Sequence, residues 1–445
     1  MKLKIYEDSK NYTAQIIRLR NVQKLEGLDN LVGASIQGNL ALISKDYPLD
    51  ELYIFFPSGC VLSEDFLSTN NLYREPTLNL DQTKKEFFEP NSRTKALKFR
   101  GHKSTALLCP LSYLSTLDVD ITRLSEGDEF NEIEGNFICR KYIVPVRGVQ
   151  GPGKKVKLLD DIIDSRHMPE HMDTDMLLKY LSHIDLHDHV VITTKLHGTS
   201  ARVGYTLTKR RLSLLEKIVK LFGCKIQTDE YKYVVGSHHV IKSVEFETLK
   251  GKQHFYSDDL WTKVSDEFFK NKLLKGEIVY YEIIGKDYEQ KEIQKDYAYG
   301  LEKPDVYVYR ISYINVDGVE IDLSWKQVKA RCNEMGVKYV PEIFVGTVYE
   351  YFVKELRRIH WSNDFTLDDE WEDFDDKWRE YFEKVIKDTY LDKPSYLDKN
   401  VIEEGICLRK EQYPRPKIYK VKAPLFYIHE GVLIDKQISN IEEEN

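Results

Sequence analysis

Over the first 146 residues, hydrophobic and polar positions alternate in short stretches that are separated by turn residues. Such alternation predicts strands whose side chains point to opposite faces of a sheet. The clearest of these strands are predicted at residues 14–20, 40–44, 52–56 and 137–144. Many short strands with few helical patterns indicate a small all-β barrel, and we expect an OB-like barrel over residues 1–146.

The pattern changes after residues 147–164, a stretch that is rich in glycine and lysine at its start and that we interpret as a linker. Residues 165–445 combine strand-like runs with helical spacing. Strands are predicted at residues 190–194, 202–205, 278–284, 306–311 and 405–409, and helices at residues 323–335 and 348–359. The chain is therefore expected to have an α+β fold, with the barrel in front of a larger domain of sheets and helices.

One further segment, residues 212–222, is both amphipathic and basic. Its spacing is compatible with a helix that lies on a membrane surface. A helix that turns its apolar face to the core is the commoner cause of such a pattern, so we expect core packing here and no membrane partner.

Composition narrows the class of protein further. The chain has 445 residues, of which 42% are hydrophobic and 31% charged, as in soluble globular proteins. Its apolar runs are shorter than the roughly 20 residues that cross a bilayer, and its N-terminus does not resemble a secretory signal. The six cysteines lie far apart without a Cys-x-x-Cys pair, which favours buried thiols in the cytoplasm or nucleus over a disulfide or zinc framework.

The candidate chemistry begins at Lys195, in Lys-Leu-His-Gly-Thr-Ser directly after an apolar strand. Glu282 follows in the strand-like Tyr-Tyr-Glu-Ile-Ile-Gly, and Glu404 stands at the mouth of another predicted strand. Lys420 and Lys422 are two residues apart, which places their ammonium groups on one face of a strand. The order along the chain is thus Lys, Glu, Glu and Lys-x-Lys.

This order resembles the covalent nucleotidyltransferases, the superfamily of DNA ligases, RNA ligases and capping enzymes. Lys195, His197 and Gly198 are similar to its first motif, and the Thr-Ser that follows looks more like RNA ligases than DNA ligases. A barrel placed before the lysine resembles the ATP-dependent RNA ligases that carry an N-terminal OB-type domain. The resemblance implies a ligase-type adenylyltransferase domain over residues 165–445.

The resemblance also implies roles for individual residues. Lys195 would carry AMP covalently, with Lys420 and Lys422 stabilising phosphate charge. The other residues expected around ATP are His197, Gly198, Arg202, Glu282, Tyr307 or Tyr309, and Glu404. Mg²⁺ or Mn²⁺ is the expected metal, with Glu404 as its ligand. Because the reaction needs a neutral amine, we expect the nearby cations to favour loss of the proton from Lys195.

Two positions remain open at this stage. Tyr281 stands where a glycine commonly precedes the glutamate of the third motif, so Glu277 competes with Glu282. Arg310 replaces a common aspartate after the stacking aromatic, so either Tyr307 or Tyr309 would be the platform for the base.

The expected partner is nucleic acid, as a nicked duplex or broken RNA, bound by a monomer. The net charge of −8 does not exclude it, because a local basic surface suffices. Candidate phosphate contacts are Arg100, Lys103, Arg140, Lys209, Arg210 and Arg211. The alternatives are a DNA ligase, a guanylyltransferase that uses GTP, and a catalytically inactive nucleic-acid-binding protein.

Overall fold

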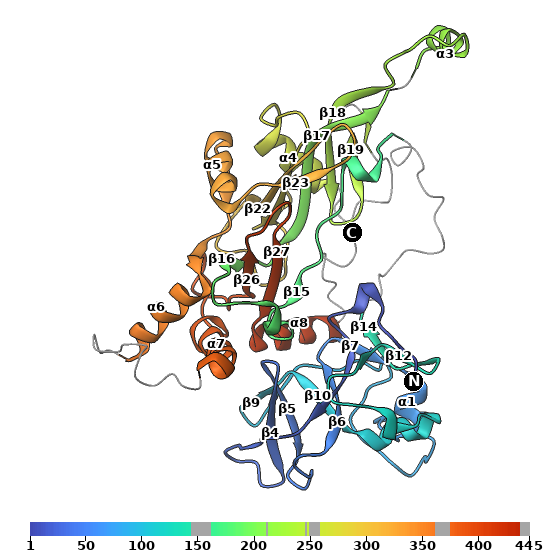
Figure 1. The fold of residues 1–445 in the computed structure, drawn as a ribbon, viewed down its shortest axis with the longest axis vertical. Helices are drawn as coiled ribbons and strands as arrows, with labels where there is room; N and C mark the ends of the chain where they lie inside the picture. The colour runs from blue at the N-terminus through green and yellow to red at the C-terminus, as the bar shows by residue number, and fades with distance from the viewer. Residues whose placement is uncertain (144–161, 211, 245–246, 249–258, 361–373, 437–445) are drawn as a thin grey trace.

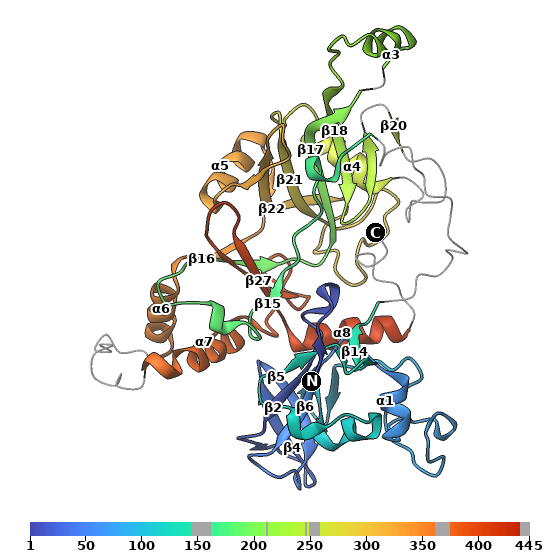
Figure 2. The same cartoon turned by 45° about the vertical axis from the view of Figure 1, so that its right-hand side comes forward.

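A computed structural model describes residues 1–143, 162–210, 212–244, 247–248, 259–360 and 374–436. The fold is α+β and consists mostly of sheets, with few helices (Figures 1 and 2). Residues 1–143 form an N-terminal part, and the residues from 162 onward form a C-terminal part. Of the linker predicted at residues 147–164, the segment up to residue 161 lies outside the described residues.

The N-terminal part contains a seven-stranded sheet in the order β11-β2-β6-β10-β5-β4-β3. Its strands are β2 (Ala14–Arg18), β3 (Gln23–Lys24), β4 (Leu31–Ile36), β5 (Asn39–Ser44), β6 (Leu52–Pro57), β10 (Ala106–Pro110) and β11 (Glu129–Phe130). The edge strands β11 and β3 do not pair with each other, so the described residues do not form a closed barrel. The strands predicted at residues 14–20, 40–44 and 52–56 are present with slightly different ends. The one predicted at residues 137–144 is interrupted, with strands only at Asn136–Phe137 and Cys139–Lys141, and residue 144 lies outside the described residues. The barrel is not confirmed.

Smaller elements complete the N-terminal part. They are β1 (Leu3–Lys4), β12 (Glu132–Ile133) and β13 (Asn136–Phe137) in one sheet, β7 (Cys60–Leu62) paired with β14 (Cys139–Lys141), β8 (Leu97–Phe99) paired with β9 (His102–Ser104), and the helix α1 (Glu64–Thr69). Strand β6 is buried on both faces: Ile54 and Phe56 enter one hydrophobic cluster, whereas Tyr53 and Phe55 enter the other. This division follows from the two-residue period of a strand.

The C-terminal part contains two sheets that meet at the turn after Lys195. The five-stranded sheet has the order β15-β27-β26-β16-β25, and the eight-stranded sheet follows β20-β19-β18-β17-β21-β22-β23, with β24 beside β22. The first comprises β15 (Asp175–Met176), β16 (His189–Lys195), β25 (Glu342–Thr347), β26 (Gly405–Lys410) and β27 (Lys417–Lys422). The second comprises β17 (Thr199–Lys209), β18 (Asp229–Ser237), β19 (Ile241–Val244), β20 (Glu247–Thr248), β21 (Glu277–Ile284), β22 (Asp305–Ile314), β23 (Glu320–Asp322) and β24 (Lys338–Tyr339).

The described helices of the C-terminal part are α3 (Leu214–Leu221), α4 (Leu260–Phe269), α5 (Trp325–Met335), α6 (Val348–His360), α7 (Phe374–Tyr390) and α8 (Pro424–Asp435). The two helices predicted from spacing are confirmed as α5 and α6. Helix α5 begins at a capping box of Ser324 and Gln327 and ends at Gly336, which adopts φ 65°. Helix α8 lies between the five-stranded sheet and the N-terminal part (Figures 1 and 2).

Ion pairs and hydrogen bonds join the two parts. Asp435 at the end of α8 accepts from Arg93 at 2.8 Å and from Lys95 at 3.0 Å. On the other side of the interface, the Lys179 Nζ atom lies 2.8 Å from the Glu129 carboxylate, and the Asn11 amide donates to the Thr174 carbonyl at 3.0 Å. These contacts fix the first part against the face that carries Lys195.

The packing predicted for residues 212–222 is wrong. Helix α3 projects beyond the β17–β18 hairpin, away from the body of the molecule (Figure 1). Leu214, Leu221 and Phe222 are 78%, 84% and 82% exposed, so the apolar face does not meet the core. Across the described residues, none of the helices combines the length and hydrophobicity needed to cross a membrane.

All six cysteines are free thiols. Four are buried and Cys407 is partly buried, in line with the expectation from sequence. Cys224 differs because it is exposed, close to the end of α3.

Candidate active site

A cavity of about 480 Å³ lies between the two parts of the chain and is lined by both. Lys195, Lys420 and Lys422 line it together with Glu282 and Tyr309. These five residues were selected from sequence, and the fold brings them into one space although they lie up to 227 positions apart.

The register of three neighbouring strands explains how the lysines meet. Lys195 of β16 pairs with Gly405 of β26, and Gly405 pairs with Lys422 of β27. Lys420 pairs with Cys407 two positions along, so both lysines of β27 share a face with Lys195. That face of the five-stranded sheet forms one wall of the cavity.

Glu404 lies directly beneath the lysines. Its Oε1 atom is 2.7 Å from the Nζ atom of Lys195 and 3.1 Å from the Nζ atom of Lys422. The carboxylate is fully buried, whereas the Lys195 side chain is 19% exposed. A buried carboxylate between two ammonium groups stabilises their charged forms. The neighbourhood of Lys195 therefore includes an anion as well as the cations that the sequence led us to expect.

Lys420 has a different environment. Desolvation, together with the nearby charges of Lys422, Lys195 and Lys141, lowers the pKa of Lys420 to about 8. Lys422 is held in place by the ring of Phe426, whose centroid lies 5.1 Å from its Nζ atom. The effect that we expected from neighbouring cations, a lowered lysine pKa, is therefore clearest at Lys420.

Gly198 allows the turn after Lys195 to pack tightly against β21. Its N–H donates to Oε1 of Glu282 at 3.0 Å, and the hydroxyl of Ser200 donates to Oε2 at 3.2 Å. A Cβ atom at position 198 would lie 2.2 Å from the carbonyl oxygen of Ile283. The glycine is therefore required by close backbone approach, and it helps to fix the Glu282 carboxylate.

The structure separates the two competing glutamates. Glu282 lines the cavity, whereas Glu277 is fully buried elsewhere, 2.7 Å from Arg331 and 3.2 Å from the hydroxyl of Tyr313. The two are five positions apart on one strand, so their side chains point to opposite faces. Of these two glutamates, Glu282 is the one that lines the cavity.

The structure also distinguishes the two candidate tyrosines, because one lines the cavity and the other lies in the core. Tyr309 lines the cavity, and its hydroxyl lies 2.6 Å from Nδ1 of His171. Tyr307 packs into the main core beneath Lys338. Arg310, which stands in place of the common aspartate, pairs with Glu320 at 2.7 Å and with Asp322 at 2.5 Å.

His197 and Arg202 do not line the cavity. The ring of His197 packs edge-on against Phe426, and its Nδ1 atom lies 3.8 Å from Glu404. The guanidinium of Arg202 donates to the carbonyls of His238 at 2.7 Å and His239 at 3.3 Å. The structure therefore places these two side chains behind the cavity lining, in contact with Glu404 and with the turn at His238.

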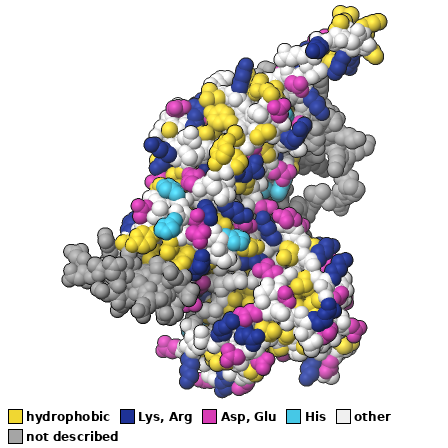
Figure 3. Space-filling view, in the orientation of Figure 1, with side chains coloured by type: hydrophobic (Ala, Val, Ile, Leu, Met, Phe, Trp, Pro, Cys, Tyr) yellow, Lys and Arg dark blue, Asp and Glu magenta, His cyan; other side chains and the backbone are white. Residues whose placement is uncertain are grey.

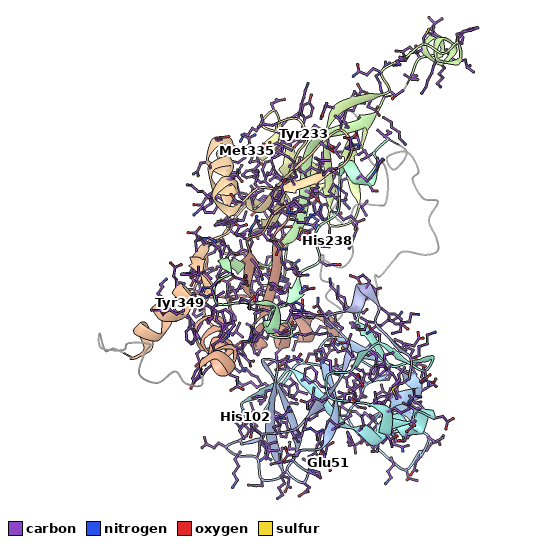
Figure 4. The ribbon with its side chains drawn as sticks, in the orientation of Figure 1. Glu51, His102, Tyr233, His238, Met335 and Tyr349 are labelled. Atoms are coloured by element: carbon purple, nitrogen blue, oxygen red, sulfur yellow. The ribbon has the colours of Figure 1, made fainter. Side chains whose placement is uncertain are left out.

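The turn that Arg202 supports borders the cavity. Strand β18 runs from Tyr233 toward His238 in the direction of the N-terminal part (Figure 4). His238 and His239 line the cavity, and the ring of His238 stacks on His171 with centroids 4.7 Å apart. Burial, reinforced by the positive groups around it, holds the pKa of His171 well below its usual range, so this ring is neutral.

The candidate nucleic-acid contacts are not gathered at the cavity. Arg100 donates to the Gly27 carbonyl, Lys103 pairs with Asp392, and Arg210 pairs with Glu216 at 2.5 Å. Lys209 lies at the far end of β17 from Lys195, about 30 Å along an extended strand. Arg211 lies outside the described residues.

Several cavity residues of the N-terminal part were missed by the sequence analysis. Arg93, Lys95 and Lys141 contribute positive charge to the cavity. Arg140 had been selected, but it is exposed and lines a separate hollow. Since neighbours on a strand alternate faces, it is Lys141 that faces Lys420. In the sequence, Arg93, Lys95 and Lys141 look like any other charged surface residues. They can be recognised as cavity residues only once the two parts of the chain are seen together.

A metal site built from protein ligands alone is not seen among the described residues, where no group of three or more His, Cys, Asp or Glu side chains is arranged to hold a metal ion. Glu404, the predicted ligand, is covered by Lys195 and Lys422 and is not open to the cavity. Its carboxylate nevertheless attracts positive charge, since the ammonium groups of Lys195 and Lys422 both lie next to it. The residues fit a cation that is held mainly by phosphate oxygens and water, with Glu404 nearby.

Comparisons with known proteins agree with this arrangement. The family described as RNA ligase matches residues 188–422, which is more than half of the chain. No curated protein matches the chain.

Among solved structures, a variant of Naegleria gruberi RNA ligase with ATP and Mn is 15% identical, with a TM-score of 0.55, over 93% of this chain and 98% of that one. A second variant with ATP and Mn is 14% identical, with a TM-score of 0.53, over 97% and 99%. A third, with AMP and Mn, is 14% identical, with a TM-score of 0.53, over 93% and 97%. At this level of identity the likeness concerns the fold, and it extends over nearly the whole of both chains.

Proposed function

The chain belongs to the RNA ligase family, and from this premise we propose that it seals RNA ends with ATP, through AMP carried on the Nζ atom of Lys195. The observation that supports this most directly is the single cavity that contains Lys195, Lys420, Lys422 and Glu282, with Glu404 beneath the first. The similar Naegleria ligases are described with ATP or AMP and Mn, which supports ATP and a divalent cation here.

In the first step the Lys195 amine attacks the α-phosphorus of ATP. An N–P bond forms, the bond between the α-phosphorus and the bridging oxygen breaks, and pyrophosphate leaves. Glu404 orients the amine from 2.7 Å, and the amine must lose a proton before it attacks. Lys420 and Lys422 face the same space and stabilise the charge on the phosphates.

The nucleoside of ATP is expected against the eight-stranded sheet. Glu282 would accept hydrogen bonds from the ribose hydroxyls and Tyr309 would stack on the base, and both side chains line the cavity. Mg²⁺ or Mn²⁺ near Glu404 would add positive charge at the α-phosphate and compete with Lys195 for the carboxylate. The interaction of Lys195 with Glu404 would then weaken as the nucleotide binds.

In the remaining steps AMP passes from Lys195 to a 5′-phosphate, and a 3′-hydroxyl then displaces AMP to form the phosphodiester. The cavity opens between both parts of the chain, so Lys141 can contact phosphates of the RNA, whereas Arg93 and Lys95 are paired with Asp435. We assign residues 1–146 to an OB-like nucleic-acid-binding domain, residues 147–164 to a linker and residues 165–445 to the adenylyltransferase domain. The substrate would be a nick or break in RNA, repaired by a monomer.

The decisive experiment is incubation with ATP labelled at the α-phosphate and with Mg²⁺ or Mn²⁺, followed by detection of labelled protein. We expect label on the wild type and none on Lys195→Ala, with Lys291→Ala as an exposed control lysine. Label from GTP alone would indicate a guanylyltransferase, and no label from either nucleotide would indicate an inactive binding protein.

A panel of adenylated nicks with ribose or deoxyribose on each side tests the nucleic acid. We expect a requirement for ribose on the side of the 3′-hydroxyl. Equal sealing of all-DNA nicks would identify a DNA ligase instead.

A further inference from the structure

Helix α3 presents an apolar surface at the tip of the β17–β18 hairpin. In the space-filling view, hydrophobic side chains cover this tip and Lys and Arg side chains adjoin them (Figure 3). The cavity described above lies at the opposite end of β17, so this surface takes no part in the proposed ligation.

The helix has two distinct faces. At 100° per residue its apolar residues span an arc of about 160° around the axis. These residues are Leu214, Leu215, Ile218, Val219, Leu221 and Phe222, and each is more than 40% exposed. The opposite face carries Glu216, Lys217 and Lys220. A helix buried in a core would cover the first face, and here it is open.

Positive charge surrounds the apolar face. Residues 209–225 contain six lysines and arginines and one acidic residue, a net charge of +5 in a chain whose total is −8. The single acid, Glu216, is paired with Arg210 and also closes the capping box at Ser213. Its negative charge is therefore compensated locally, while Lys217 and Lys220 remain exposed.

We propose that α3 docks the protein on the surface of an anionic lipid bilayer, with the apolar face in the boundary between headgroups and acyl chains and the lysines at the phosphates. Charge selects this partner: a second copy of the chain would bring two basic tips together, and RNA would leave the apolar face in water. The helix is about 12 Å long, so it lies in the interface and does not cross the membrane. This inference is independent of the ligase chemistry and revises the expectation that the chain has no membrane partner.

Co-sedimentation of the full chain with vesicles tests the proposal. The expected result is binding to phosphatidylcholine vesicles that contain phosphatidylserine and little binding to phosphatidylcholine alone. Lys217→Gln/Lys220→Gln should weaken binding by about tenfold or more, and Leu214→Ser/Leu221→Ser/Phe222→Ser should abolish it.

Matched variants control for charge and hydrophobicity elsewhere. Lys270→Gln/Lys291→Gln removes two exposed charges outside the hairpin, and Leu80→Ser/Val316→Ser removes two exposed apolar side chains. Both should bind vesicles like the wild type. Loss of binding in either, or equal wild-type binding to both kinds of vesicle, would overturn the proposal.

Two further outcomes would favour other partners. If the apolar-face variant converted a dimer into a monomer in sedimentation velocity, the face would belong to a second copy. If the Lys217/Lys220 variant lost affinity for RNA and kept its affinity for vesicles, the basic tip would bind RNA. Either result would reject the lipid surface.

Cys224 provides a direct probe of insertion, because it is exposed and immediately follows the turn after α3. A polarity-sensitive fluorophore on this thiol should shift to shorter wavelength when phosphatidylserine vesicles are added. An unchanged spectrum under conditions in which the protein sediments with vesicles would show that another surface makes the contact. Circular dichroism and thermal unfolding of the same samples show that each variant is folded.

Discussion

The Nζ atom of Lys195 lies 2.7 Å from Oε1 of Glu404, and the same oxygen lies 3.1 Å from the Nζ atom of Lys422. The proposed nucleophile is therefore held by a buried carboxylate. This arrangement fixes the direction of the amine, but it also opposes loss of the proton. Binding of ATP with a divalent cation must therefore change the partners of both groups.

Replacement of Glu404 by glutamine should lower the rate of Lys195 adenylylation by about a hundredfold. The amide removes the negative charge that orients the amine and that would attract the cation. The measurement is the single-turnover rate of labelling from α-labelled ATP. Glu403→Gln is the matched control, because Glu403 is buried beside it and burial raises its pKa to about 7, so at neutral pH the amide replaces a carboxyl that is charged only about half of the time. Equal loss in both variants would contradict a specific role for Glu404.

The pKa of Lys420, lowered to about 8, predicts a limit on activity at high pH. Below this pH the side chain is charged and stabilises the phosphates, and above it the charge is lost. We expect kcat/KM for ATP to fall as the pH rises through about 8, and we expect Lys420→Arg to move this fall to higher pH because arginine stays charged. A pH profile of adenylylation for the wild type and for Lys420→Arg measures this shift. A fall at the same pH in the arginine variant would assign the limit to another group.

Gly198→Ala should destabilise the protein by about 2 kcal/mol and slow adenylylation, because its Cβ would meet the Ile283 carbonyl. The backbone of β21 cannot move aside as a flexible side chain could. The added Cβ atom therefore displaces the turn that follows Lys195. Thermal unfolding measures the loss. Gly431→Ala serves as the control, since the nearest atom beyond its own helix, Nη2 of Arg93, would lie 3.9 Å from the added carbon and α8 is helical there; it should keep or raise the melting temperature.

The two glutamates of β21 should have separable effects. Glu282→Gln is expected to raise the KM for ATP about tenfold, because the ribose would lose a charged acceptor. Glu277→Gln should leave this KM unchanged but lower stability by about 3 kcal/mol, because it leaves Arg331 without its buried partner. Nucleotide titrations and urea unfolding of both variants make the comparison. A higher KM in the Glu277 variant would return the choice to Glu277.

Much of this site was predictable from sequence because the proposed chemistry depends on short motifs. The lysine before a turn, the two glutamates at strands and the Lys-x-Lys pair each have their own local pattern, so these residues can be selected as candidates without knowledge of the register. Three neighbouring strands then place Lys195, Gly405 and Lys422 side by side. The choice between Glu282 and Glu277 required the structure, because both lie on the same apolar strand.

Other features could not be read from sequence because they depend on contacts between distant segments. The amphipathic pattern of residues 212–222 is the same whether the helix packs on a core or extends into solvent, and only the hairpin that carries α3 decides it. His197 and Arg202 lie within the expected motifs, yet their side chains contact Glu404 and the turn at His238 and do not line the cavity. Strand positions alone likewise could not show that the seven-stranded sheet stays open between β11 and β3.

Lys141 and Arg140 provide a test of the contribution of the N-terminal part. They are neighbours on β14 with equal charge, yet Lys141 lines the cavity and Arg140 faces the other side. We expect Lys141→Ala to slow sealing of a nicked RNA about tenfold, because a cation near Lys420 is lost from the path of the phosphates. Arg140→Ala should seal at the wild-type rate, and both variants should melt like the wild type because both side chains reach solvent. Measuring adenylylation and sealing separately assigns the defect to a step. Equal effects of the two substitutions would mean that the N-terminal part acts only through its overall charge. The position of Lys141 at the cavity would then have no consequence for catalysis.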